Sequence, residues 1–350
     1  MNILAIESSC DETGAAVLTQ HGDQISILSN IISTSLELHA KTGGIIPEVA
    51  AREQVKFIIP VIQEALGKAF SYTLSSTPPP IDAIAVTYGP GLIGSLLVGV
   101  ETAKTLSLLW NIPIIPVNHM YGHIYANFIH GKGIELPAIA LVVSGGHTDL
   151  IFLKSHTEIE HIGQTRDDAA GEAFDKIGRL LGLPYPAGPT ISKLAINGDH
   201  TSFNLPRPMI GSHDFDFSFS GLKTSVLNVL KTQKLDFANE DFAKNNQQIL
   251  SDLCASVQYA IVNVLTRKTH KAVEKYRPKT LLVGGGVAAN TALKESLTSA
   301  IKNDWPEIVI HIPDRSLCTD NAAMIAAHAF FLTPQKDINT ITAAPGLSYI

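Results

Sequence analysis

A strand–turn–strand pattern that occurs twice constrains the fold of this chain more than any other feature. Each copy is an apolar strand, a polar turn and a second apolar strand, and the copies span residues 3–18 and 138–153. The first copy opens the first half of the chain and the second copy opens the second half. This repetition predicts a duplicated architecture.

Between and after the two copies, apolar strands alternate with longer helical patterns. The expected strands span 81–87, 114–117 and 280–283, and the expected helices span 47–68, 93–109, 246–276, 289–301 and 319–332. The segment 163–246 is expected to be mostly helical with loops, and the tail after Pro334 is expected to be loosely ordered. Alternating strands and helices predict an α/β fold with mixed sheets.

The composition fits a large folded protein. The chain has 350 residues, of which 45% are hydrophobic, enough for a large core or for two lobes that share a cleft. Its N-terminus shows no secretory signal. The segment 91–110 comes closest to the roughly 20 apolar residues of a membrane span, but Glu101 and Lys104 interrupt it. We expect a cytoplasmic protein without membrane contact. A reducing compartment also fits the three widely spaced cysteines, Cys10, Cys254 and Cys318.

The net charge of −6 argues against a protein whose whole surface binds nucleic acid. One segment, residues 267–279, is locally basic and contains a single acid, Glu274. Its basic residues are Arg267, Lys268, Lys271, Lys275, Arg277 and Lys279. They form either a solvated helix face or a patch for a polyanion, and a patch would make binding depend on salt.

A pair of histidines is the first candidate site. His119 and His123 follow the apolar strand 114–117. Asn118, directly before His119, is a good N-cap, so the histidines are expected to open a helix. At a spacing of four they share one helical face, where two imidazoles can bind one cation at about 2 Å. The end of a strand is also where α/β folds usually bind ligands. The alternative is two ordinary histidines on a helix surface.

The histidine pair lacks the general base of a zinc protease. Such enzymes carry Glu directly after the first histidine, whereas Met120 stands there in this chain. Asp320, at the start of the last expected helix, is the candidate for a third ligand, and helix capping is its alternative role. Two histidines and one carboxylate with open positions suit iron(II) or another divalent ion.

Three glycine turns could bring the backbone close to a phosphate or a nucleoside. They are residues 144–146, 187–189 and 284–286. The last runs through Asn290 into a helix, as a nucleoside-binding turn does, but no P-loop lysine follows. Any one of these turns alone could simply reverse the chain.

Acidic residues form two further groups. Asp11 and Glu12 lie in the first hairpin turn, where they could orient a nucleophile or a water, or serve only as turn residues. A second group shares one helical face and consists of Asp168, Glu172 and Asp175. These acids could face a cation or ribose hydroxyls, or they could form a solvated first turn that the helix dipole favours.

Taken together, these segments resemble the tRNA threonylcarbamoyladenosine transferase family, also known as the glycoprotease or O-sialoglycoprotein endopeptidase family. The matching segments run in order along most of the chain. They are residues 7–13, 43–48, 89–92, 118–123, 143–148, 167–176, 219–223, 284–290 and 318–321.

The resemblance implies an α/β fold of the actin/Hsp70/sugar-kinase type with two ribonuclease H-like lobes and a cleft. The expected domains are an N-terminal lobe at 1–115, a C-terminal lobe at 116–335 with the metal and nucleotide site, and a tail at 336–350. The implied reaction transfers threonylcarbamoyl from threonylcarbamoyl-AMP to the exocyclic amine of adenosine 37, beside the anticodon, in tRNAs that read codons starting with adenine. A metal-dependent glycoprotease is the alternative, and a non-catalytic scaffold is a third.

The resemblance also implies which residues form the site. One divalent metal, expected to be Fe²⁺ with zinc or magnesium as alternatives, would be held by His119, His123 and Asp320. The adenylate-binding positions correspond to Val142, Val143, Ser144, Gly145, Gly146, Asp175, Gly188, Ser192 and Asn290. Ser192 stands where relatives often have an acid.

Two further features concern the branch of the family and the partners. Val142 replaces a tyrosine ligand of archaeal and eukaryotic relatives and, together with His147, indicates the bacterial branch. Asp11 and Glu12 are expected to position or deprotonate the acceptor amine. The implied partners are tRNA, a smaller inactive paralogue and a P-loop ATPase.

Overall fold

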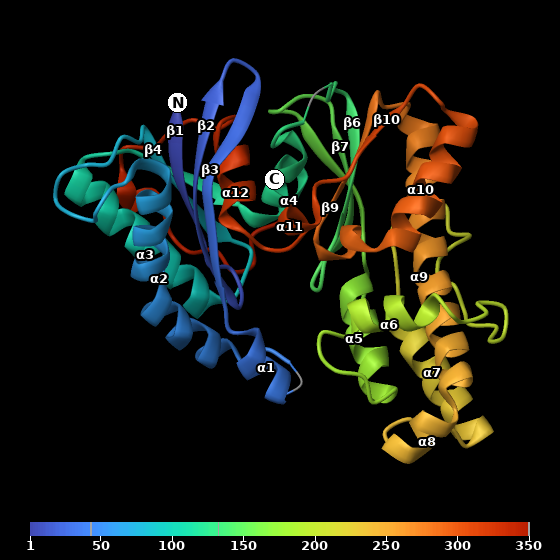
Figure 1. Cartoon of the computed structure of the whole chain (residues 1–350). Helices are drawn as coiled ribbons and strands as arrows, with labels where there is room; N and C mark the ends of the chain where they lie inside the picture. Colours follow the sequence, from blue (N-terminus) through green and yellow to red (C-terminus); the bar gives the residue numbers. More distant parts are fainter. Residues whose placement is uncertain (43, 132, 349–350) are drawn as a thin grey trace. The chain divides into compact units, whose positions relative to one another are not determined.

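The computed structural model contains two compact units (Figure 1). It describes residues 1–42, 44–131 and 133–348. Gly43, which opens the 43–48 segment, and residues 349–350 of the expected tail lie outside the described residues. The first unit combines Met1–Ile134 with Pro313–Ile350, and the second unit is Glu135–Ile312.

The sheet of the first unit has the order β3-β2-β1-β4-β5. Its strands are β1 (Asn2–Glu7), β2 (Glu12–His21), β3 (Gln24–Thr34), β4 (Ala83–Gly89) and β5 (Ile114–Asn118). The first three strands pair antiparallel, whereas β4 and β5 run parallel to β1. All residues from Ile3 to Ile6 are buried, because helices cover both faces of the sheet.

Helices pack on the two faces of this sheet. Figure 1 shows α2 (Pro47–Phe70) and α3 (Ile93–Trp110) on one side and α12 (Ala322–Ala329) on the other. The short α4 (His119–Tyr125) packs against α12 so closely that a Cβ at Gly122 would come within 2.8 Å of Ile325. Glycine there allows α4 to approach α12. The shorter elements of this unit are α1 (Leu36–Thr42), η1 (Ala126–Phe128), α11 (Arg315–Cys318) and η3 (Ile338–Thr340).

The sheet of the second unit repeats the topology of the first. Its order is β10-β9-β6-β7-β8, with β6, β7 and β8 antiparallel and with β9 and β10 parallel to β6. The strands are β6 (Ala138–Val143), β7 (Thr148–Leu153), β8 (Ile159–Gln164), β9 (Thr280–Gly284) and β10 (Val309–His311). The duplication predicted from the two hairpins is therefore confirmed, with β6 and β7 in the places of β1 and β2.

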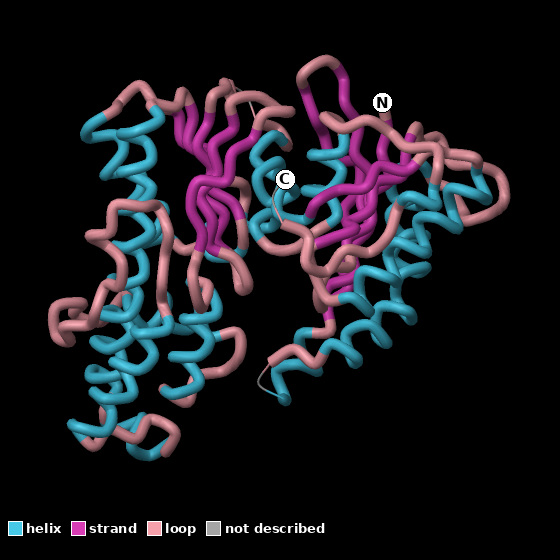
Figure 2. The backbone as a smooth tube through the Cα atoms, turned by 180° about the vertical axis from the view of Figure 1, so that it is seen from behind, coloured by secondary structure: helices cyan, strands magenta, loops and turns pink. Residues whose placement is uncertain are grey.

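The second unit contains the described helices of the middle segment and the helices that follow it up to Ile312, which Figure 2 shows as a group beside and below the magenta strands of that unit. The longest, α9 (Gln247–Tyr276), packs against α6 (Ala187–Ala195) and α10 (Thr291–Asp304). The other helical elements are α5 (Ala170–Leu180), α7 (Ser220–Gln233), α8 (Glu240–Asn245) and η2 (Gly286–Ala289).

Two described helices, α3 and α9, are long and apolar enough to cross a membrane. The sequence pattern had excluded such a stretch. Within their most apolar windows, 44% of α3 and 72% of α9 is buried inside the structure. Core helices pass the same test of length and composition, so these two helices are weak evidence for a membrane span.

The boundaries expected from the sequence follow residues 115 and 335. In the structure, the contacts divide the chain after Ile134 and after Ile312. Strand β5 pairs with β4, and α4 packs on α12, so both belong to the first unit. The segment after Pro334, expected to be loosely ordered, is hydrogen-bonded to this unit. Ala344 N–H donates to the Tyr88 carbonyl at 2.7 Å, and Ile341 is buried in the core.

Candidate metal centre and nucleotide site

The histidine pair lies at the start of α4, as the sequence predicted. Asn118 ends β5 and caps the helix, since its Oδ1 accepts a hydrogen bond from Met120 N–H at 2.9 Å. His119 and His123 follow at a spacing of one turn. Their rings meet edge to face, with centroids 4.8 Å apart. Both side chains are buried.

Asp320 faces both histidines. Its Oδ1 lies 3.6 Å from His119 Nε2 and 3.3 Å from His123 Nε2. The capping role belongs to the neighbouring residue, because Asn321 Oδ1 accepts the hydrogen bond from Met324 N–H at the start of α12. The carboxylate of Asp320 is therefore oriented toward the imidazoles.

These three side chains fit a divalent cation. Their ligand atoms lie within 4.8 Å of one another. His123 is 1% exposed, and neither of its ring nitrogens has a hydrogen-bond partner. A buried nitrogen without a partner is costly, and coordination to a cation would satisfy it. Two imidazole nitrogens and one carboxylate oxygen form a donor set for iron or zinc.

Glu7, at the end of β1, holds the other side of His119. Its Oε2 accepts hydrogen bonds from His119 Nδ1 at 3.1 Å and from Thr87 Oγ1 at 2.5 Å, and its Oε1 accepts from Ser9 N–H at 2.6 Å. A proton on Nδ1 leaves Nε2 free to point toward Asp320. Sequence reasoning missed this role. The signal was an acid at the end of a wholly apolar strand.

Charge and burial oppose each other at this pair. Burial raises the pKa of Glu7, but the charge of His119 and the hydrogen bonds from His119 and Ser9 together outweigh it, so the pKa of Glu7 is lowered. For His119, burial lowers the pKa, whereas Glu7 and Asp320 together raise the pKa to about 9. The surrounding carboxylates thus favour positive charge at this place, whether a proton or a metal ion supplies it.

Asp11 lies in the turn between β1 and β2, and Glu12 is the first residue of β2. Asp11 is buried, and its carbonyl accepts hydrogen bonds from the backbone and the hydroxyl of Ser35. Burial, with the negative charges of Asp320 and Asp11, raises the pKa of Glu12 to about 10. These two acids therefore share the environment of the metal-ligand candidates.

In the second unit, the turn between β6 and β7 exposes its backbone. Val142 and Val143 are buried at the end of β6, whereas Gly145 and Gly146 are exposed. A Cβ added at either glycine would meet no atom within 4 Å, so the backbone there is open to a ligand. Ser144 Oγ accepts from the N–H of His147 at 3.2 Å, which closes the turn.

Helix α5 and the η2 turn pack tightly on this glycine turn. Gly171 N–H donates to the Ser144 carbonyl, and a Cβ at Gly171 would come within 2.5 Å of that oxygen. Gly285, with φ of +88°, lies so close to β6 that a Cβ would come within 2.4 Å of the Val143 carbonyl. The carboxyl ends of β6 and β9 therefore meet at the turn.

The remaining predicted nucleotide contacts lie on α5, on α6 and at the N-cap of α10. Asp175 Oδ1 accepts from Ala187 N–H at 2.7 Å, and burial raises its pKa. Asn290 Nδ2 donates to Ser192 Oγ at 2.9 Å, while its Oδ1 caps α10. Gly188 follows Ala187 on α6 and has room for a ligand, with no atom closer than 3.9 Å to an added Cβ.

Two details of this unit were not predicted. Gln258 on α9 also accepts from Asn290 Nδ2, at 3.0 Å, and no local pattern indicated it. The acidic face of α5 is largely paired, since Lys176 contacts Asp168 at 2.6 Å and Glu172 at 2.9 Å. These two acids are thus paired with a lysine, whereas Asp175 accepts from the backbone at the start of α6.

Comparison with known families gives one match over most of the chain. The model of the family described as "TsaD: tRNA N6-adenosine threonylcarbamoyltransferase" matches residues 26–327. A relative of that name from Moorella thermoacetica is 46% identical over 99% of this chain and 96% of its own length. A second from Lacticaseibacillus casei is 47% identical, over 99% of this chain and 97% of its own length.

Two solved structures resemble this chain in fold. Full-length HypF in its phosphate- and nucleotide-bound form gives a TM-score of 0.56 at 13% identity, covering 94% of this chain and 46% of HypF. HypF of T. kodakarensis gives 0.57 at 12% identity, covering 96% of this chain and 49% of HypF. At this identity the likeness concerns the fold alone. With the duplicated sheets, it confirms the actin/Hsp70/sugar-kinase-like α/β class.

Proposed function

The chain belongs to the tRNA N6-adenosine threonylcarbamoyltransferase family, and we propose that it transfers threonylcarbamoyl from threonylcarbamoyl-AMP to adenosine 37 of tRNAs that read codons starting with adenine. The transfer to tRNA follows from the family. The donor, the position and the codon class are our proposal. The observation that carries its chemistry is the cluster of the buried His119 and His123 with the partly buried Asp320 in the first unit.

The reaction joins an amine to an activated carbonyl. In the donor, the carbamoyl carbon is linked through oxygen to the phosphate of AMP. The exocyclic amine of adenosine attacks this carbon and a C–N bond forms. The C–O bond to phosphate then breaks, AMP leaves with the electron pair, and the amine loses a proton. A protein can accelerate this by orienting donor and amine and by stabilising charge on the carbonyl oxygen.

We assign binding of the donor to the second unit. The exposed backbone amides near Gly145 and Gly146 would hold the phosphate or the threonyl part. Asp175, together with Ser192 and Asn290, would contact the nucleoside. The support for this assignment is that Asn290 contacts Ser192 and that the β6–β7 turn is open to solvent.

We assign charge stabilisation to the first unit. A divalent cation bound by His119, His123 and Asp320 would supply Lewis-acid polarisation of the donor's carbonyl or phosphate oxygen. Glu7 fixes the orientation of His119 through Nδ1. Asp11 and Glu12 would position the amine or accept its proton. We propose iron(II), with zinc as the alternative that suits two imidazoles; magnesium prefers oxygen ligands.

We also propose a cytoplasmic location, with a smaller inactive paralogue and a P-loop ATPase as protein partners. These proposals rest on the family resemblance of the sequence segments. Mixing experiments with the candidate partners, read out by co-elution and by the rate of transfer, would test them.

The deciding experiment is a transfer assay on unmodified tRNA. The reaction contains threonine, bicarbonate, ATP, the adenylate-forming synthase and the proposed partners, and threonylcarbamoyladenosine is quantified by mass spectrometry of nucleosides. We expect product that disappears on metal depletion and returns on addition of iron(II). A parallel peptide-cleavage assay examines the glycoprotease alternative, which lacks a base next to His119. Metal-dependent cleavage without transfer would contradict the proposal.

A further inference from the structure

The basic segment 267–279 was open to two interpretations, and most of its side chains prove to be structural. Lys268 is 1% exposed and donates to Ser212 Oγ at 2.6 Å and to the Asp214 carbonyl at 3.0 Å. Lys271 donates to the Ser212 carbonyl at 2.8 Å. These lysines hold the loop before α7 against α9.

The C-terminal end of the basic segment is also occupied. Lys279 pairs with Glu135 at 2.9 Å, and the Arg277 guanidinium lies over the ring of Trp305. Lys275 lies over Phe215. A continuous basic face for a polyanion is therefore not present in this segment.

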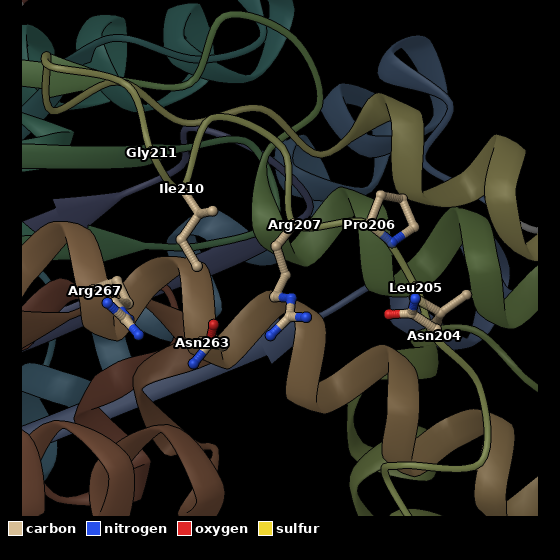
Figure 3. A pocket seen from close by; sticks show the side chains of 8 residues that line it. All are labelled: Asn204, Leu205, Pro206, Arg207, Ile210, Gly211, Asn263 and Arg267. Atoms are coloured by element: carbon tan, nitrogen blue, oxygen red, sulfur yellow. The ribbon is translucent and has the colours of Figure 1, made fainter.

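Arg267 is exposed and lines a cavity of about 500 Å³. Across this cavity, Arg207 extends from the loop toward α9, where Asn263 and Arg267 lie (Figure 3). Among the residues that the structure describes, neither guanidinium forms an ion pair with a carboxylate. Two guanidinium groups in one cavity without a counter-charge favour an anionic ligand.

An adjoining cavity of about 310 Å³ shares Arg207 and adds aromatic side chains. The Arg207 guanidinium lies 5.8 Å from the ring centroid of Tyr259, and His200 meets the same ring edge to face at 4.3 Å. Tyr259 is 40% exposed. An exposed aromatic ring beside arginines is the arrangement on which unpaired nucleic-acid bases stack.

The loop that carries Arg207 is anchored at its far end. Asp214 accepts from the buried Lys268 and from Arg166 Nη2 at 2.7 Å, and Asp216 accepts from Arg166 Nε at 2.8 Å. A ligand that binds here therefore does not have to order the loop first, which lowers the entropic cost of binding.

We propose that this paired cavity is a contact site for the tRNA substrate, with Arg207 and Arg267 binding backbone phosphates and Tyr259 stacking on an unpaired base. The choice of RNA rests on the proposed function. It also rests on charge, because a chain with net charge −6 repels RNA on average and needs a local positive site. The combination of two arginines, amides and an exposed aromatic ring fits a nucleic-acid strand better than a lone phosphate.

The test measures binding of unmodified tRNA to the full-length protein over a series of salt concentrations. The variants are Arg207→Ala, Arg267→Ala, the double variant and Tyr259→Leu. The control is Lys231→Ala, which removes the same charge from an exposed position on α7 that lines neither cavity. Thermal unfolding of each variant verifies that it folds. If the double variant does not fold, Arg267→Ala, at an exposed position, still tests the contact.

We expect the double variant to bind tRNA about tenfold to a hundredfold more weakly at low salt, as lost charge-assisted contacts would predict. The slope of log K against log salt should fall by about 1.5 to 2, because two phosphate contacts are lost. The KM for tRNA should rise while kcat at saturating tRNA changes little. Tyr259→Leu should weaken binding without changing the slope.

The outcomes separate this inference from the proposed function. A wild-type protein that modifies no tRNA overturns the function and removes the basis of the inference. An active wild type whose double variant keeps the wild-type Kd and salt slope overturns the tRNA contact alone. Competition by AMP or inorganic phosphate as strong as that by tRNA, lost in the double variant, would reassign the cavity to a small anion.

Discussion

The two units have the same sheet order, yet their first hairpins place different chemistry at the turn. In the first unit, Asp11 lies in the β1–β2 turn, between Glu7 at the end of β1 and Glu12 at the start of β2, and all three residues are buried or partly buried. In the second unit, the β6–β7 turn holds Gly145 and Gly146 with exposed backbone and without an acid. One hairpin thus offers side chains and the other offers main-chain amides.

This difference shows what the duplicated fold contributes and what it does not. The topology brings a tight turn to the end of the first strand in both units. The residues in and beside the turn then decide its chemistry, which is carboxylates in the first unit and exposed main-chain amides in the second. The units should therefore respond differently to substitution, and the following predictions run from the largest expected effect to the smallest.

Replacing a histidine of the first unit should have the largest effect. In His119→Ala or His123→Ala, one of the three proposed ligands is lost, so we expect metal affinity to fall more than about 100-fold, beyond the effect of changing a residue that only orients a ligand. Transfer to tRNA should be lost in parallel. Metal content per chain and threonylcarbamoyladenosine yield are the measurements.

The control for this change is His161→Ala in the second unit. His161 Nε2 lies 2.9 Å from Asp149 Oδ1, so this variant also breaks a histidine–carboxylate contact. It should keep metal binding and transfer. Near-normal threonylcarbamoyladenosine formation by the His119 or His123 variants would remove the metal role from the first unit.

Glu7→Gln should have the next largest effect, although Glu7 is not a ligand. The amide is a weaker acceptor for His119 Nδ1–H, so the imidazole is less well oriented and less basic. We expect metal affinity to fall about 10- to 100-fold. Titration with cobalt(II), followed by its visible spectrum, measures affinity and ligand geometry independently of activity.

Thr87→Val is the matched control for Glu7→Gln, because it removes only the hydrogen bond from Thr87 to the same carboxylate. It should cost about 0.5–1.5 kcal/mol of stability and leave the cobalt spectrum unchanged. An unchanged cobalt spectrum and affinity in Glu7→Gln would show that Glu7 is only a buried structural acid.

Local sequence patterns predicted the features of the site that depend on local structure. The cap at Asn118, the shared face of His119 and His123, and the glycine turn at 144–146 each follow from a few neighbouring residues. Asp320 was proposed as the third metal ligand from its place at the start of the last expected helix, and the family resemblance implied the same residue. The structure brings it to the histidines without testing its role.

Contacts between distant segments could not be predicted in this way. Glu7 meets His119 only because β1 and β5 both flank β4, and Arg207 meets Arg267 only because a loop folds onto α9. Lys268 is a similar case. Its sequence neighbours placed it in the basic segment 267–279, but in the structure it is buried and paired with Asp214. The expected domain boundary after residue 115 differs from the division by contacts, which follows Ile134, for the same reason. The expectation was made without the pairing of β5 with β4.

Substitution of Asn290 tests the second unit, and we expect a moderate effect on AMP binding. Asn290→Asp keeps the side-chain oxygen that caps α10 but loses the Nδ2 donor to Ser192 and Gln258. We expect weaker AMP binding, on the order of tenfold for one lost donor, with little change in stability. Asn290→Ala should weaken binding as well and also cost about 0.5–2 kcal/mol of stability.

Asn239→Ala is the control for cap loss, since Asn239 caps α8 by accepting from Phe242 N–H. Calorimetric titration with AMP and urea unfolding separate the two effects. If Asn290→Asp binds AMP as tightly as the wild type, Asn290 is a helix cap only, and the nucleoside contact must lie elsewhere in the unit.

The smallest effect concerns the pH dependence of stability, and it is expected at Asp167 in the second unit. Burial raises the pKa of Asp167 in the second unit, but hydrogen bonds from Ser218, Phe219 and Ser220 outweigh it, so its pKa is lowered. The stability that the lowered pKa of Asp167 contributes is complete above the unfolded pKa of about 3.9, and it is lost as the pH falls through the lower folded pKa.

The variant Asp167→Asn has no carboxyl group to titrate at this position. The difference in unfolding free energy between wild type and variant should therefore stay constant from pH 7 to about pH 5 and shrink below about pH 4. Urea unfolding at each pH measures it, and a difference that persists unchanged at pH 3 would show that the carboxylate charge contributes nothing to these hydrogen bonds.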